Sequence, residues 1–186
     1  MNDLARQISE LSPQQRCLLE VRLGERKGVP EPIAVVGMGC RFPGAASLAD
    51  YWQLLWRGQD GIGDIPGDRW SLEEFFSADP SQAGKHYCRQ GGFLQHIDQF
   101  DPEFFGIAPR EAPYMDPQQR LLLEVMWEAL EDSALLPQAL SGSQTGVFVG
   151  ASTLDYGQIL LQRDDRIGPY TTTGLASTML ANRISY

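Results

Sequence analysis

The chain has 186 residues, 42% hydrophobic and 21% charged, which is typical of one globular domain or a large part of one. Its formal net charge of -9 argues against nucleic acid and anionic membrane as partners. No stretch approaches the roughly 20 apolar residues that span a bilayer, and no secretory signal is predicted. Three widely spaced cysteines do not make a disulfide framework, so we expect a cytoplasmic protein.

Residues 1–31 predict a helical flank outside the core. Ser12 is placed as an N-cap, Pro13 as the first helical residue and Gln15 at the capping-box position. Glycine and prolines at 28–32 then end the helix. Two interpretations stay open: a linker helix that lies on its own domain, or a docking or dimerising helix of a multienzyme.

Residues 33–37 form an apolar run that ends in glycine, which predicts a strand buried on both faces. Gly37 and Gly39 after such a strand invite comparison with a nucleotide-binding loop. The third glycine of that loop would fall at Phe42, so the sequence argues against nucleotide binding.

Residues 47–57 predict an amphipathic helix capped by Ser47. A long excursion follows over 58–115, with a short strand expected near 91–94. Within it we expect a structural clasp, in which Arg69 pairs with Asp64 or another acid and Trp70 is buried.

The cysteines and histidines do not form a catalytic or metal-binding set. Cys40 ends the first predicted strand with no histidine near it in sequence, so a buried small side chain is expected there. Cys17 and Cys88 have no partner at metal-ligand spacing, and His86 and His96 lack a completing cluster. No metal site is predicted.

Residues 117–132 are the best-specified helix. Asp116 is placed as its cap and Pro117 in its first turn. Glu124, Glu128 and Glu131 fall at i, i+4 and i+7, which predicts a solvated stripe opposite an apolar face.

A second buried strand is predicted at 145–150, followed by helices near 155–162 and 174–186. Strands that alternate with helices in this order predict α/β layering with a parallel component.

Several motifs, in order along about residues 32–186, resemble the ketosynthase (beta-ketoacyl synthase) domain of modular type I polyketide synthases. They are Pro32–Gly44, Ile65–Trp70, Gly91–Leu94, Phe100–Ile107, Pro109–Ala112, Met115–Glu124, Trp127–Asp132 and Ala181–Tyr186.

The resemblance implies the N-terminal portion of a thiolase-like αβαβα fold, preceded by a helical linker and normally part of a homodimer. The implied reaction is a decarboxylative Claisen condensation. A cysteine takes the acyl chain from the phosphopantetheine arm of an acyl carrier protein and condenses it with a malonyl-type unit. No cofactor is then bound directly. The implied partners are the acyl carrier protein, an acyltransferase and other polyketide synthase domains.

By the same resemblance, the nucleophilic cysteine is expected after Tyr186 and both histidines later still. We therefore expect 1–31 to be a linker or docking helix and 32–186 to be a ketosynthase part truncated before its catalytic cysteine. No catalytic residue is assigned, and the chain alone is expected to be inactive. The alternative is a non-catalytic half, or interaction module, that pairs with a complementary chain.

Segment 170–179 resembles the region that reaches toward the partner protomer's acyl pocket. Thr171, Thr172 and Met179 are the candidates for lining the substrate pocket or dimer interface. The other interpretation is that they only pack a dimer helix.

Overall fold

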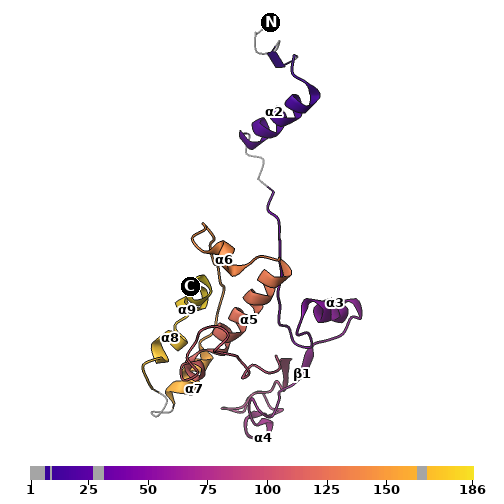
Figure 1. The fold of residues 1–186 in the computed structure, drawn as a ribbon. Helices are drawn as coiled ribbons and strands as arrows, with labels where there is room; N and C mark the ends of the chain where they lie inside the picture. Colours follow the sequence, from indigo (N-terminus) through magenta and orange to yellow (C-terminus); the bar gives the residue numbers. More distant parts are fainter. Residues whose placement is uncertain (1–6, 9, 27–31, 163–166) are drawn as a thin grey trace. The chain divides into compact units, whose positions relative to one another are not determined.

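The structure is a computed structural model that describes residues 7–8, 10–26, 32–162 and 167–186. The chain divides into two compact units, Met1–Val35 and Val36–Tyr186, and each is described by itself. The first unit contains α2 (Pro13–Arg26) (Figure 1). Its capping box is formed as predicted, because the Gln15 N–H donates to Ser12 Oγ at 3.2 Å and the Ser12 N–H donates to Gln15 Oε1 at 3.0 Å. Most of the helix break expected at 28–32 lies outside the described residues.

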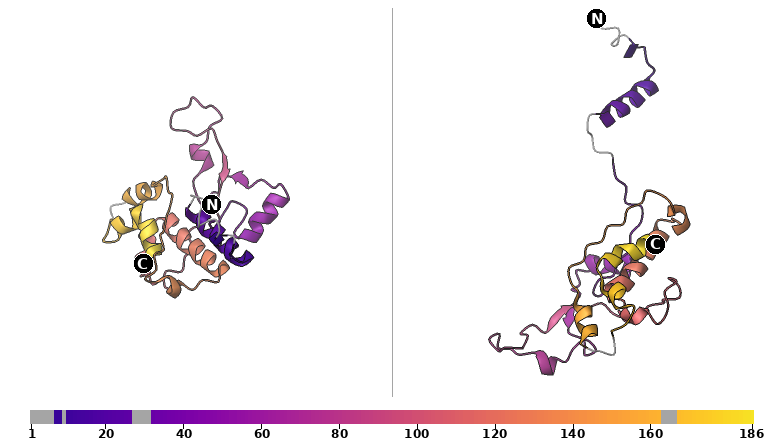
Figure 2. Two further views of the ribbon diagram at one scale, coloured as in Figure 1. Left: turned by 90° about the horizontal axis from the view of Figure 1, so that it is seen from above. Right: turned by 90° about the vertical axis from the view of Figure 1, so that its left-hand side faces the viewer.

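Most of the regular secondary structure in the second unit is helical. Its elements are α3 (Leu48–Trp56), β1 (Ile62–Asp64), α4 (Leu72–Phe75), β2 (Gln90–Gly92), the 3₁₀ turn η1 (Ala112–Tyr114), α5 (Pro117–Asp132), α6 (Pro137–Leu140), α7 (Asp155–Leu161), α8 (Thr171–Leu175) and α9 (Thr178–Ser185). Helix α5 runs between α3 on one side and α8 and α9 on the other (Figures 1 and 2).

Local capping signals explain where α3 and α5 begin. Ser47 Oγ accepts the Asp50 N–H at 3.2 Å, and Asp116 Oδ1 accepts the Gln118 N–H at 2.8 Å. Proline follows Asp116 at the first helical position, where its missing N–H leaves no hydrogen bond unmade. Both helices predicted from sequence are confirmed.

The core lies where α5 packs against the C-terminal helices. Met115 is fully buried just before α5, and Leu123 on α5 and Leu180 on α9 are 5% exposed. Close packing also sets the junction after η1, because a Cβ on Gly174 would lie 2.1 Å from the Tyr114 carbonyl oxygen. Only glycine fits at that position.

Within the described residues the sheet structure is one antiparallel pair, with Ile62 opposite Gly92 and Asp64 opposite Gln90. β2 overlaps the strand expected near 91–94. The predicted strands at 33–37 and 145–150 are absent, and Ile33 and Phe148 are each 95% exposed. A strand needs a neighbour for its ladder hydrogen bonds, and neither segment has one in the described chain.

Two other expectations are corrected. The helix predicted at 174–186 is split into α8 and α9, because Ala176 takes an extended conformation (φ -67°, ψ 124°). In the excursion, Trp70 is 41% exposed, and Asp64 is bound by Arg89 at 2.8 Å. Arg69 donates to the Leu94 carbonyl at 2.8 Å, and its Nε lies 3.9 Å from the Asp68 carboxylate, so the expected pairing of Arg69 with an acid other than Asp64 is confirmed.

Candidate functional site

A buried amide links α5 to the C-terminal helices. Gln119, in the first turn of α5, is 2% exposed. Its Nε2 donates to the carbonyls of Gly174 (2.8 Å) and Thr173 (3.3 Å). Its Oε1 accepts a hydrogen bond from Arg183 Nε at 2.8 Å. A buried amide is tolerated only when both ends are paired, and here they are.

Arg183 extends this cluster to a third segment. Its Nη2 donates to Glu111 Oε1 at 2.6 Å, and the two side chains are only 13% and 18% exposed. The Gly174 carbonyl also accepts the Asp116 N–H at 2.9 Å. One polar cluster thus fixes α8 and α9 on α5. It joins residues of three separate sequence motifs, 109–112, 115–124 and 181–186.

A second cluster binds the segment before α3 to the C-terminal half of α5. The Arg41 guanidinium makes a two-pronged contact with the Glu128 carboxylate, and its Nη1 also donates to the Ala46 carbonyl at 2.8 Å. The Met38 N–H donates to Asp132 Oδ2 at 3.0 Å. The hydrogen bond to Glu128 raises the pKa of Arg41.

This geometry corrects the predicted solvated stripe on α5 at two of its three positions, because Glu124 and Glu128 are half-buried whereas Glu131 is exposed as predicted. Glu128 is held by Arg41, and Glu131 Oε1 accepts the Trp127 indole N–H at 2.9 Å. Glu124 lines a cavity of about 620 Å³ that Arg41 and His96 also border. Burial raises the pKa of Glu124, against the attraction of nearby guanidinium groups. The periodicity of the helix could not predict the cavity beside Glu124, because that cavity is formed together with residues distant in sequence.

A larger cavity, of about 800 Å³, lies at the N-terminal end of α5. Arg120 borders it with its guanidinium 6.0 Å from the Tyr156 ring centroid, and its Nε is buried without an acceptor. Asp116 and Asp155 also line this cavity. Arg120 was not among the predicted site residues, because helical spacing does not show that its Nε is buried without an acceptor.

The structure brings His86 and Cys88 to one cavity of about 390 Å³. Alternate residues of an extended segment share a face, so the spacing of two between His86 and Cys88 is the sequence feature that could have placed them together. Cys88 Sγ donates to the Gln90 carbonyl at 3.1 Å, and His86 stacks on Trp70 with ring centroids 5.4 Å apart. Cys40 lines a different, apolar groove that no histidine borders. In the described part of the chain, no group of three His, Cys, Asp or Glu residues is placed to hold a metal ion.

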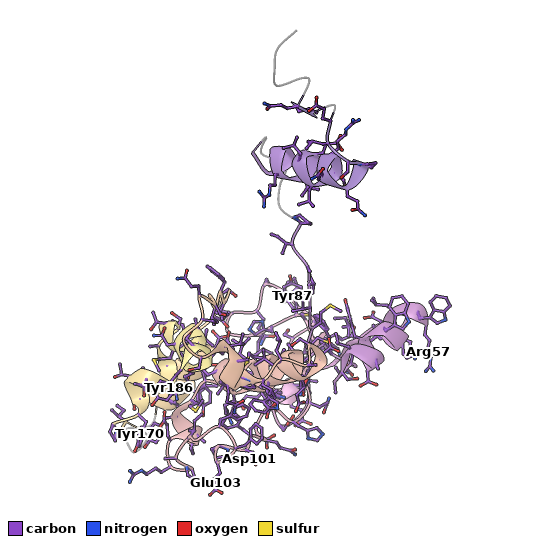
Figure 3. The ribbon with its side chains drawn as sticks, turned by 45° about the horizontal axis from the view of Figure 1, so that its top comes forward. Arg57, Tyr87, Asp101, Glu103, Tyr170 and Tyr186 are labelled. Atoms are coloured by element: carbon purple, nitrogen blue, oxygen red, sulfur yellow. The ribbon has the colours of Figure 1, made fainter. Side chains whose placement is uncertain are left out.

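The three predicted pocket residues lie on or beside α8 and α9, at the end of the second unit that carries Tyr170 and Tyr186 in Figure 3. Thr171 is half-buried, and its Oγ1 accepts the Gly168 N–H at 2.8 Å. Thr172 is exposed. Met179 is half-buried, and its backbone N–H donates a hydrogen bond to the Ala176 carbonyl. None of the cavities described above is lined by these residues. Their role in an acyl pocket or dimer interface stays a prediction.

Residues 30–186 match a family model described as beta-ketoacyl synthase, N-terminal domain. The whole chain is 45% identical to part of a phenolphthiocerol/phthiocerol polyketide synthase component of Mycobacterium tuberculosis, of which it covers 10%. Over 84% of its length it is 48% identical to the pikromycin polyketide synthase component PikAII of Streptomyces venezuelae, of which it covers 4%.

Solved structures agree with these sequence matches. The oxazolomycin ketosynthase domain OzmH KS7 of Streptomyces albus superposes on 84% of the chain with a TM-score of 0.74 and 37% identity. The ketosynthase from module 6 of the bacillaene synthase of Bacillus subtilis superposes on 82%, with a TM-score of 0.68 and 35% identity. The chain covers 27% and 24% of those two structures.

These matches confirm the expected fold class, the N-terminal portion of a thiolase-like ketosynthase. In addition, no helix of the described residues is long and apolar enough to cross a membrane. The motifs that meet around Gln119 and Arg41 all lie within the matched residues. This chain belongs to the beta-ketoacyl synthase family, and residues 30–186 are its N-terminal domain.

Proposed function

We propose that this chain is the architectural N-terminal part of a polyketide synthase ketosynthase. In the proposed reaction a cysteine thiolate outside these residues attacks an acyl thioester and releases the carrier protein's phosphopantetheine thiol. A malonyl-type thioester then loses carbon dioxide, and the resulting carbanion attacks the acyl-cysteine carbonyl. The cysteine thiolate leaves as the new carbon–carbon bond forms.

One observation carries this assignment: residues 30–186 match the family's N-terminal domain, and the motif residues of that region are hydrogen-bonded to one another. Glu111, Gln119 and Arg183 use their polar atoms to fix helices. Side chains whose polar atoms make such contacts suit scaffolding better than proton transfer.

The chain alone is proposed to lack condensing activity. Cys40 lies in an apolar groove without a base, and Cys88 donates its thiol proton to a backbone carbonyl. The chain is incubated with an acyl-carrier-protein thioester and its mass is measured intact. We expect no acyl adduct, and a stoichiometric adduct on Cys40 or Cys88 would overturn this part of the proposal.

The partners in this proposal are the acyl carrier protein that brings the phosphopantetheine arm, an acyltransferase, and a second ketosynthase protomer. The names of the relatives support a multienzyme setting, since they are polyketide synthase components. Thr171, Thr172 and Met179 keep their proposed place at the acyl pocket or dimer interface.

We further propose that residues 1–31 act as a linker or docking helix outside the catalytic domain. The family model begins at residue 30, and α2 exposes Leu18 and Val21 (59% and 56%). Deletion of 1–31 is expected to leave the melting temperature of the second unit unchanged and to remove binding to a preceding synthase module. Unchanged module binding after deletion would contradict a docking role.

A further inference from the structure

The Glu124 cavity is the space of about 620 Å³ beside the middle of α5. Its lining comes from three parts of the chain, within 41–50, 94–101 and 121–124. The volume falls in the range of about 300–1,000 Å³ that is usual for small-molecule sites. Each of the three parts brings one carboxylate to the cavity, and these are Asp50, Asp101 and Glu124.

Local hydrogen bonds hold two walls of this cavity in place. Phe42 and Ala45 exchange backbone hydrogen bonds of 2.9 Å in both directions, which closes the turn between them. In the facing wall, the Gln99 N–H donates to the His96 carbonyl at 3.1 Å, and the Gln99 amide lies 3.1 Å from His96 Nδ1. Because each turn is closed by its own bonds, the cavity has its shape without a ligand.

The charges around the cavity are not balanced. The guanidinium that borders it, on Arg41, is already held by both carboxylate oxygens of Glu128. Glu124, in contrast, accepts no hydrogen bond and joins no ion pair among the described residues. Burial raises its pKa although Arg41 and Arg120 attract the ionised form. A half-buried carboxylate without a partner is costly to ionise, and a bound cation would lower that cost.

The rest of the lining suits the hydrocarbon part of a ligand. Leu94, Phe100 and Leu121 border the cavity and are half-buried, and Phe42 adds an aromatic ring that is 44% exposed. Aromatic rings attract ammonium groups through their faces. A metal ion fits less well, because no group of three His, Cys, Asp or Glu residues in the described chain is placed to hold one.

We infer that the Glu124 cavity binds a small organic amine in its ammonium form. The cationic group lies at the Glu124 carboxylate, and the hydrocarbon part lies against the aromatic and aliphatic walls. Binding of this kind needs no condensation chemistry, so the inference goes beyond the proposed function and stands or falls independently of it.

Calorimetric titration of this chain with phenethylammonium, at pH 7 and low ionic strength, tests the inference. Two probes of similar shape change only the charge, since 2-phenylethanol is neutral and 3-phenylpropanoate is anionic. We expect the amine to bind at least about tenfold more tightly than the alcohol, because only the amine forms a charge-assisted contact. The anion should bind more weakly than the alcohol, because it meets three carboxylates.

Two variants on α5 show whether Glu124 holds the ammonium. Glu124→Gln should weaken binding of the amine about tenfold or more, and Glu131→Gln should change it less than about twofold. Glu131 is the matched control because it lies on the same helix outside the cavity. Melting temperatures are measured in parallel. Glu124→Gln should be at least as stable as the natural chain at pH 7, so that lost binding cannot come from unfolding.

Binding should weaken as the pH falls toward the raised pKa of Glu124, because protonation removes the charge that holds the ammonium. The other ionisable side chains that line the cavity or flank Glu124 are Arg41, Asp50, His96, Asp101, Arg120 and Glu128. His96 has a φ of 54°, so His96→Asn keeps a residue that tolerates this conformation. The pH dependence should persist in His96→Asn and disappear in Glu124→Gln.

Equal binding of the amine and the alcohol, or equal binding of the amine by the natural chain and Glu124→Gln, would overturn the inference. Tighter binding of Nα-acetyl-lysine amide than of phenethylammonium would also overturn it, because the cavity would then suit a lysine side chain of another protein. The titration is repeated on a ketosynthase domain that carries residues 30–186 of this chain. The same preference is expected there, and its loss would show that the rest of the domain fills the cavity.

Discussion

Arg183 on α9 donates from its Nε to Oε1 of Gln119 on α5 at 2.8 Å, across 64 residues of sequence. Because Gln119 also holds the carbonyl of Gly174, one buried side chain fixes the position of both C-terminal helices.

Gln119→Leu should lower the free energy of unfolding by about 1–3 kcal/mol, because it removes the acceptor of the buried Arg183 Nε and the amide donor to the Gly174 and Thr173 carbonyls. Urea denaturation measures the change. Gln118→Leu is the matched control, since this neighbouring amide is half-buried and donates to the Asp116 carboxylate and the Thr153 carbonyl. An equal loss in both variants would show that Gln119 has no special role.

The Arg41–Glu128 pair should contribute measurably to stability, although 23% and 40% of its side chains are exposed. Glu128→Gln is expected to cost about 1–2 kcal/mol, because a partly buried guanidinium loses its two-pronged acceptor. A double-mutant cycle with Arg41→Met tests whether the loss comes from this pair. If the changes in the free energy of unfolding are additive, the Arg41–Glu128 contact makes no pairwise contribution to stability.

Glu124→Gln should stabilise the protein at neutral pH. The folded-state pKa of Glu124 is raised above its ordinary value of 4.5, so ionising this carboxyl works against folding. The stability that the protonated form contributes is complete below about pH 4.5 and is lost as pH rises through the folded pKa. Melting temperatures of the variant and the natural chain should therefore converge in acid and separate near pH 7. A variant that melts lower at pH 7 would contradict this account.

Gly39→Ala should detach residues 37–40 from α5, because the new Cβ meets a backbone oxygen that cannot move aside alone. We expect a loss of about 1–3 kcal/mol and faster proteolysis near residue 39. Gly63→Ala serves as control, since a Cβ there meets nothing within 4 Å. Equal protease resistance in the two variants would argue against close packing at Gly39.

Structure that depends on neighbours a few residues apart could be predicted from the sequence. The caps at Ser12, Ser47 and Asp116 are local hydrogen bonds, and each was predicted from residue type and spacing. The family motifs in 32–186 also identified the fold class, because many ordered motifs together are specific.

Structure that depends on distant partners could not be predicted in this way. The apolar runs at 33–37 and 145–150 have strand composition, but a strand forms only beside another strand. The stripe at Glu124 and Glu128 looked solvated because helical periodicity does not reveal Arg41, which lies 87 residues away from Glu128. The meeting of Glu111, Gln119 and Arg183 likewise follows from tertiary packing rather than from any local pattern.

The most direct test of the central claim is a chimera in which this chain's residues 30–186 replace the matching part of the oxazolomycin ketosynthase domain. Condensation of an acyl and a malonyl carrier-protein thioester is followed by mass spectrometry of the carrier-bound product. The account predicts a β-ketoacyl product from the chimera and none from this chain alone. A folded chimera that accepts the acyl group but forms no condensation product, or condensation by this chain alone, would contradict it.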